Sequence, residues 1–166
     1  MATLESIRCF VMLSPLKEAT MQEFSDLQIQ SERYGETYTN ARGRRTGADC
    51  TVKALAACFD LSYGKAQRTM AKAGREFRRG GNVMHISRGI EIITGEDYES
   101  IKGEFVDSME GRALPTLNQF CKANPKGSFY VIVSGHAICI RDGRLIDWTA
   151  DTAGKRKVKY VYKVKG

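Results

Sequence analysis

The sequence contains no long apolar run, and its first residues lack a basic stretch followed by an apolar one. A membrane-spanning helix needs about 20 apolar residues, and a secretory signal needs the basic-then-apolar pattern, so we expect a cytoplasmic protein that does not enter a membrane. Internal repeats, low-complexity runs and domain linkers are also missing. A chain of 166 residues with 42% apolar content therefore fits one globular domain with a sizeable core.

Cysteine and histidine are few and scattered. The cysteines occur at Cys9, Cys50, Cys58, Cys121 and Cys139. None of them forms the short-spaced pair that zinc sites use, so we expect reduced thiols, no metal and no cofactor. The two histidines, His85 and His136, leave few candidates for a catalytic base.

The net charge of +7 is concentrated at one end of the chain. The last dozen residues contain no acid and six basic residues: Lys155, Arg156, Lys157, Lys159, Lys163 and Lys165. The rest of the chain therefore carries a net charge of only +1. Since no recognisable nucleic-acid-binding motif accompanies these charges, we expect them to meet an acidic partner, and nucleic-acid binding is not the predicted primary role.

Turn residues and hydrophobic periodicity predict helices in the first part of the chain. A short strand over residues 4–13 precedes a helix that begins at Ser14-Pro15 and runs to about Arg33, and residues 34–48 form an extended segment. Ser62 caps a helix that continues to Phe77, and isoleucines at helical spacing favour another helix after residue 83.

After a short helix capped by Thr116, the hydrophobic period changes to two. Strands are predicted over residues 129–133, 136–140, 144–148 and 157–164, with a hairpin turn at Asp142-Gly143. In the last strand we expect Val158, Tyr160, Tyr162 and Val164 to share one face, with lysines on the other. A lysine-lined strand is typical of a sheet edge, so residues 155–166 are predicted to form a basic edge strand. The predicted fold class is α+β, with N-terminal helices packed on a C-terminal antiparallel sheet.

Cys50 is predicted to begin an amphipathic helix. Val52, Leu55 and Phe59 have the spacing of one buried helical face, and Gly47 with Asp49 supplies a turn and a cap. A thiol at a helix N-terminus has a lowered pKa, because the partial positive charge there favours the thiolate. Cys50 is therefore a candidate nucleophile, and the alternative is a small buried apolar residue.

His136 and Asp147 are the candidate partners of this thiol. His136 follows a glycine and opens a strand, and Asp147 lies eleven residues later on the next strand. A hairpin centred on Asp142-Gly143 places the two side chains near each other. In the other interpretation, Asp147 only caps a turn at Thr149, and the third group comes from Asn118, Gln119 or the segment between His85 and Leu114.

The order of these residues resembles the papain-like cysteine peptidases, especially small bacterial and phage members such as the bacteriocin leader-processing peptidases. The matching stretches are Asp49-Cys50-Thr51-Val52-Lys53-Ala54-Leu55-Ala56, Gly135-His136-Ala137-Ile138 and Asp147. The likeness covers about residues 45–150, which leaves residues 1–44 as an N-terminal extension. It implies a papain-like domain with a Cys50–His136–Asp147 triad, a protein or peptide substrate, and a location in a bacterial or phage-infected cell.

The oxyanion hole departs from the pattern of that family. Its members commonly place a glutamine a few residues before the nucleophile, whereas residues 41–49 contain neither glutamine nor asparagine. Asn40 is the nearest side-chain candidate, and the backbone N–H of Cys50 is the other donor. The expected function is a thiol hydrolase that cleaves a peptide or isopeptide bond. The alternatives are a cell-wall amidase, an acyltransferase, an inactive peptide-binding relative, or a nucleic-acid-associated protein that uses the basic tail.

Overall fold

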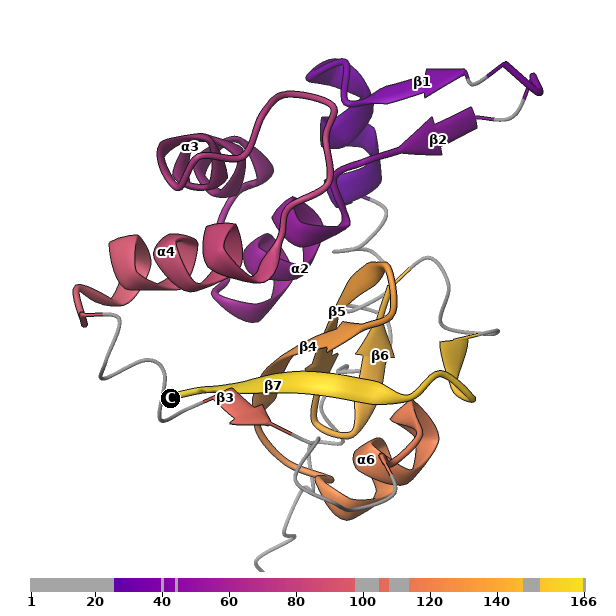
Figure 1. Ribbon diagram of the computed structural model, residues 1–166, viewed down its shortest axis with the longest axis vertical. Helices are drawn as coiled ribbons and strands as arrows, with labels where there is room; N and C mark the ends of the chain where they lie inside the picture. The colour runs from indigo at the N-terminus through magenta and orange to yellow at the C-terminus, as the bar shows by residue number, and fades with distance from the viewer. Residues whose placement is uncertain are drawn as a thin grey trace, which may run out of the picture.

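The computed structural model describes residues 26–39, 41–43, 45–97, 105–107, 114–147 and 153–165. Within these ranges the helices come mainly first and an antiparallel sheet follows, so the α+β prediction is confirmed (Figure 1). The strand predicted over residues 4–13 lies outside the described residues, as does the start of the helix predicted from Ser14. Residues 26–33 are helical, in agreement with that prediction. No helix in the described ranges has the length and apolar character needed to cross a membrane.

The first part of the chain consists of a small hairpin and a layer of helices. Its elements are β1 (Thr37–Thr39), β2 (Arg45–Gly47), α2 (Cys50–Cys58), α3 (Tyr63–Lys72) and α4 (Val83–Thr94). Ser62 caps α3 through the Lys65 N–H, as expected. The helix ends before Phe77, contrary to the prediction, because Gly74 adopts a φ of +99° that interrupts helical geometry. In Figure 1 this layer lies above the sheet.

The second part of the chain forms a five-stranded antiparallel sheet of order β3-β7-β4-β5-β6. Its elements are β3 (Phe105–Asp107), α6 (Leu117–Ala123), β4 (Ser128–Val133), β5 (His136–Arg141), β6 (Arg144–Ile146) and β7 (Val158–Val164). The four predicted strands are confirmed, although β6 ends one residue before Asp147. Asp142 and Gly143 both have positive φ, which is the two-residue hairpin turn predicted between β5 and β6.

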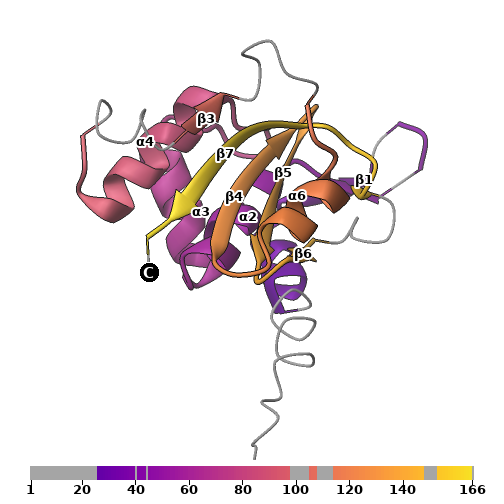
Figure 2. The same ribbon diagram turned by 90° about the horizontal axis from the view of Figure 1, so that it is seen from below.

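Both faces of the sheet are buried, because helices cover each of them (Figure 2). On one face, Tyr130, Ala137, Cys139 and Tyr162 join a core with α2, α3 and α4. On the other face, Val131, Ile138 and Ile140 pack with Leu117 of α6. Successive residues of β4 and β5 therefore alternate between two cores, which explains why these strands read as nearly continuous apolar runs.

The structure corrects the prediction for the last strand. β7 lies between β3 and β4, so it is not an edge strand, although β3 covers only Tyr160–Tyr162. The pairing of β4 with β7 also shifts by one residue after Ile132, a β-bulge at Lys159. Because of this shift, Val158 packs with the α6 core while Tyr162 and Val164 pack with the α2 core. Three of the four residues expected on one face are thus divided between two faces.

Candidate active site

Cys50 is the first residue of α2, and its thiol is half-buried. The first hydrogen bond of the helix runs from the Lys53 N–H to the Asp49 carbonyl oxygen at 3.0 Å. The N–H of Cys50 therefore has no acceptor within the helix. It is one of the unpaired N–H groups that give the N-terminus of a helix its partial positive charge. The predicted placement of Cys50 at a helix N-terminus is confirmed.

His136 is the first residue of β5, directly after the Ser134-Gly135 turn, and its side chain is 6% exposed. Its Nε2 donates a hydrogen bond to Oδ2 of Asp147 at 2.8 Å. Asp147 follows the last residue of β6, and its side chain is 5% exposed. The structure therefore brings the predicted base and its predicted partner into direct contact.

Cys50 lies against His136 and the start of β5, although the two residues are 86 positions apart in sequence. Burial raises the pKa of the Cys50 thiol, but hydrogen bonds from the His136 ring and the Ala137 N–H, with the charge of His136, lower it overall. Burial lowers the pKa of His136, yet the hydrogen bonds and charges of Asp147 and Cys50 raise it to about 9. His136 is therefore an imidazolium at neutral pH, and Cys50 forms a thiolate, the reactive form of a cysteine nucleophile, more readily than an ordinary thiol does.

The remaining described cysteines and the second histidine do not take part. Burial and the neighbouring Cys139 thiol raise the pKa of Cys58, whose thiol donates to the Phe129 carbonyl oxygen at 3.3 Å, and burial raises the pKa of Cys121. His85 accepts a hydrogen bond from the Asn82 N–H at 3.4 Å and completes a capping box at the start of α4. Among the described residues, no group of His, Cys, Asp or Glu could hold a metal ion.

Asp49, the residue before the nucleophile, makes contacts that the sequence did not predict. It occupies the N-cap position of α2, but its side chain makes no cap hydrogen bond. Instead, its Oδ2 accepts from Ser31 Oγ at 2.5 Å and from the Tyr63 hydroxyl at 2.7 Å. Its Oδ1 lies 3.2 Å from Nζ of Lys53, which also donates to Gln28. Of these contacts, the sequence indicated only the one with Lys53, because Asp49 and Lys53 carry opposite charges four positions apart at a helix start.

These contacts hold the start of α2 in place on the helix of residues 26–33 and on α3. Burial raises the pKa of Asp49, but the charge of Lys53 and the hydrogen bonds from Ser31, Tyr63 and Lys53 lower it overall. The carboxylate is therefore ionised and 1% exposed. Its negative charge acts against the Cys50 thiolate. Lys53 offsets that effect, because its positive charge lies 3.2 Å from the same carboxylate.

A second ion pair fixes the chain just before the nucleophile. Both guanidinium Nη atoms of Arg75 lie 3.1 Å from the carboxylate oxygens of Glu36, and both side chains are buried. Nη2 also donates to the carbonyl oxygen of Ala48 at 3.1 Å. Arg75 thus connects the loop after α3 to the hairpin and to the residue two positions before Cys50.

Gly81 packs directly on the residue after the nucleophile. A Cβ at Gly81 would lie 2.9 Å from Oγ1 of Thr51, 3.0 Å from its Cγ2 and 3.2 Å from Cε of Met70. Thr51 is 3% exposed, and its Oγ1 has no hydrogen-bond partner in the described part of the chain. Only glycine permits this approach of the loop to the first turn of α2.

Other predicted residues are not part of this arrangement. Asn40 and the Thr149 turn lie outside the described residues. Gln119 belongs to the capping box of α6, where its side chain accepts from the Thr116 N–H at 2.8 Å. Asn118, on the same helix, lies against Gly154, and this helix packs on the face of the sheet opposite α2. Neither is placed beside His136 by these contacts, so Asp147 is the described partner of the imidazole.

No known protein family, curated protein or solved structure matches this chain.

Proposed function

We propose that this protein is a cysteine peptidase, a thiol hydrolase that cleaves a peptide or isopeptide bond through Cys50, His136 and Asp147. The observation that carries the proposal is the continuous contact from thiol to imidazole to carboxylate, with the pKa of the thiol lowered and that of the imidazole raised. A structural cysteine has no need of a paired imidazole and carboxylate at a helix N-terminus. A nucleophile needs both, because the imidazole keeps the thiol deprotonated and the carboxylate orients the imidazole.

The proposed reaction follows from the positions of these groups. The Cys50 thiolate attacks the substrate carbonyl, and the carbonyl oxygen gains negative charge near the Cys50 N–H. Since Nε2 of His136 is bonded to Asp147, Nδ1 is the ring nitrogen that can give its proton to the leaving amine. Water, deprotonated by the now neutral imidazole, then attacks the thioester and releases the acid.

The same groups would also serve an amidase that acts on cell-wall peptides or an enzyme that transfers the acyl group to another amine. These activities differ in the substrate and in the molecule that accepts the acyl group, water or an amine. The chemistry of the thiol is the same in each. A thioester intermediate on Cys50 is expected for all of them. A binding protein that has lost turnover would form no such intermediate.

The test is digestion of a peptide library prepared from a whole proteome, with new peptide ends identified by mass spectrometry. The parent protein should generate new ends, and Cys50→Ala should reduce their formation by at least about 10³-fold. Cys121→Ala is the matched control, because Cys121 is also half-exposed but has no imidazole partner among the described residues. If Cys50→Ala cleaves as fast as the parent, the proposal is wrong.

A further inference from the structure

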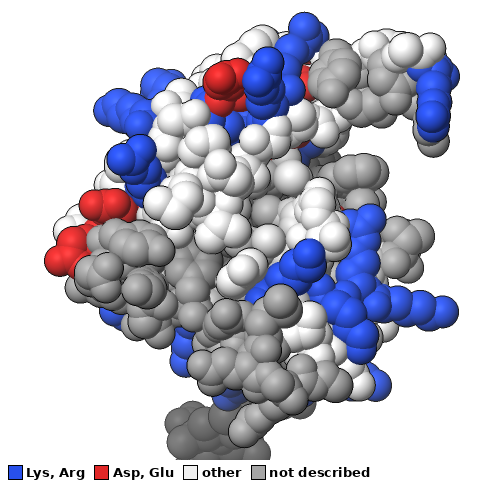
Figure 3. Space-filling view, viewed as in Figure 1, with Lys and Arg blue, Asp and Glu red and all other residues white. Residues whose placement is uncertain are grey.

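Three consecutive exposed basic residues, Lys155, Arg156 and Lys157, directly precede β7. They lie at the end of the sheet that carries His136, because the register aligns Val158 with Val133 and Val133 with His136. Neighbouring strands are about 4.8 Å apart, so the start of β7 is roughly 10 Å from the start of β5. Lys and Arg side chains gather over this part of the molecule in Figure 3.

The backbone of this basic segment is held by hydrogen bonds. The Arg156 N–H donates to the Ala153 carbonyl at 2.8 Å, and the Arg156 carbonyl accepts from the Leu117 N–H at 2.9 Å. The Val158 N–H donates to the Pro115 carbonyl at 2.9 Å. The backbone of the segment is therefore fixed before a ligand binds, so that only its side chains would have to be ordered.

Two basic residues at the opposite end of the sheet form ion pairs with acidic side chains. There, Arg141 pairs with Asp60 at 2.8 Å, and Lys165 pairs with Glu96 at 3.2 Å. No described acidic side chain forms an ion pair with Lys155, Arg156 or Lys157. The positive potential next to the candidate site is consequently not compensated by a described neighbour.

We propose that Lys155, Arg156 and Lys157 bind an acidic segment of the peptide substrate, an inference that rests on the proposed peptidase function. An extended peptide advances about 3.4 Å per residue, so the acidic residues would lie about three positions from the bond that is cleaved. A single-stranded nucleic acid is a poorer fit, because such ligands need exposed aromatic side chains for stacking. The exposed aromatic side chains among the described residues, Tyr34 and Phe77, belong to the first, helical part of the chain.

The test measures how fast peptide alkylators modify Cys50. One pair of probes carries an N-terminal chloroacetyl group, two glycines and either three glutamates or three glutamines. A second pair carries the same residues before a C-terminal chloromethyl ketone, so that both sides of the reacting carbon are sampled. For one of the two pairs, the glutamate probe should react about fivefold faster than the glutamine probe at low ionic strength. The preference should disappear in 0.5 M salt.

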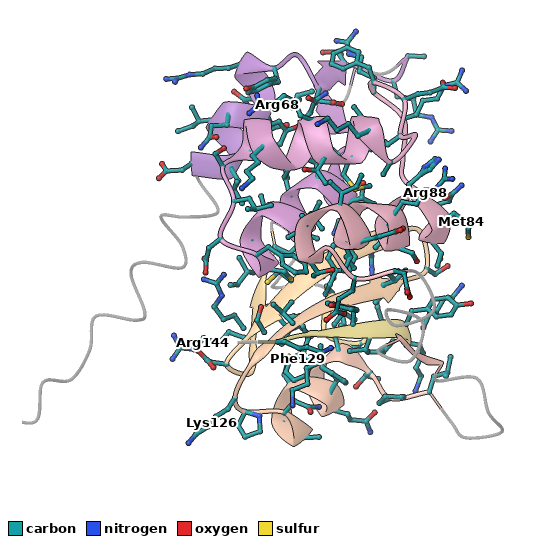
Figure 4. The ribbon with its side chains drawn as sticks, turned by 90° about the vertical axis from the view of Figure 1, so that its left-hand side faces the viewer. Arg68, Met84, Arg88, Lys126, Phe129 and Arg144 are labelled. Carbon is teal, nitrogen blue, oxygen red and sulfur yellow. The ribbon has the colours of Figure 1, made fainter. Side chains whose placement is uncertain are left out.

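Two triple variants separate this surface from general charge. K155Q/R156Q/K157Q should abolish the preference for glutamate and leave the glutamine rates unchanged. The control K126Q/R144Q/K163Q removes the same charge at the opposite end of the sheet and should keep the preference. Lys126 and Arg144 project into solvent at that end (Figure 4). Far-ultraviolet circular dichroism checks that both variants are folded.

Failure of this inference is distinguishable from failure of the proposed function. If both probes of each pair label Cys50 at equal rates, the acidic-substrate inference is wrong, and the peptidase proposal is unaffected. If neither probe labels Cys50 faster than Cys121, the peptidase proposal itself fails. A fluorescent 20-nucleotide single strand that binds the parent, loses affinity in K155Q/R156Q/K157Q and slows both probes would identify a nucleic-acid surface and overturn the inference.

Discussion

Asp147 accepts a hydrogen bond from Nε2 of His136 at 2.8 Å from a position just beyond the end of β6. The register pairs Cys139 with Ile146, so Asp147 is next to Ile138 and its side chain reaches back along β5 to the ring. This contact fixes which ring nitrogen remains for Cys50. The hairpin turn is therefore part of the candidate catalytic geometry.

Asp147→Asn should lower the rate by at least tenfold, and by up to about 10⁴-fold, because the amide keeps the size of the side chain but does not stabilise the imidazolium. The urea midpoint should change little. Asp142→Asn is the matched control, since Asp142 lies in the adjacent turn, where its Oδ1 accepts from the Gly127 N–H at 3.0 Å, a bond that an asparagine side chain can keep. A fully active Asp147→Asn protein would leave at most a Cys50–His136 dyad.

The pH dependence should have two limbs. On the acid side the rate falls as the Cys50 thiolate is protonated, and this limb lies below the ordinary thiol pKa of 9.0 because the pKa in the folded protein is lowered. Above pH 9 the rate falls as His136 loses the proton needed by the leaving group, because its pKa is about 9. Alkylation of Cys50 by iodoacetamide, measured against pH, reports the thiolate alone. His136→Gln should move that curve to higher pH, and an unmoved curve would contradict the pairing.

Iodoacetamide at pH 7 should modify Cys50 before the other described cysteines. Burial raises the pKa of Cys58 and of Cys121, and Cys139 is buried, so each should react at least about tenfold more slowly. Peptide mapping of the alkylated protein after short exposure measures the order. Faster labelling of Cys121 in the folded protein would reject Cys50 as the activated thiol.

Asp49→Asn should destabilise the fold by about 3 kcal/mol, because it removes the charge opposite the buried Lys53 ammonium. The measurement is the urea midpoint. Glu76→Gln is the control, since the Glu76–Arg79 pair is exposed to solvent and its loss should leave the midpoint almost unchanged. Equal midpoints for the two variants would show that the network around Asp49 contributes no stability.

Gly81→Ala should reduce the rate of Cys50 alkylation and of turnover by at least tenfold. The added methyl group would meet Thr51 and Met70, so the first turn of α2 must shift relative to His136. Gly80→Ala is the control in the same loop, because a Cβ there meets nothing within 4 Å. If both variants retain the parent rate, the contact of Gly81 with Thr51 does not position the nucleophile.

The sequence alone determined the local features of this protein. The helix start at Cys50, the caps at Ser62 and Thr116 and the four strands were predicted because each depends on residues within a few positions of one another. The contact between His136 and Asp147 was also predictable, since one tight turn at Asp142-Gly143 separates their strands.

Only the tertiary structure decided the features that depend on distant residues. Asp49 was predicted to cap α2, yet Ser31 and Tyr63, 18 and 14 positions away, bind its carboxylate. Likewise, lysines predicted an edge strand, but pairing with β3 placed β7 inside the sheet and a bulge divided its apolar residues between two cores. The hydrophobic periodicity of a sequence indicates which side chains become buried. It does not report which distant partner they meet, because that depends on how the whole chain packs.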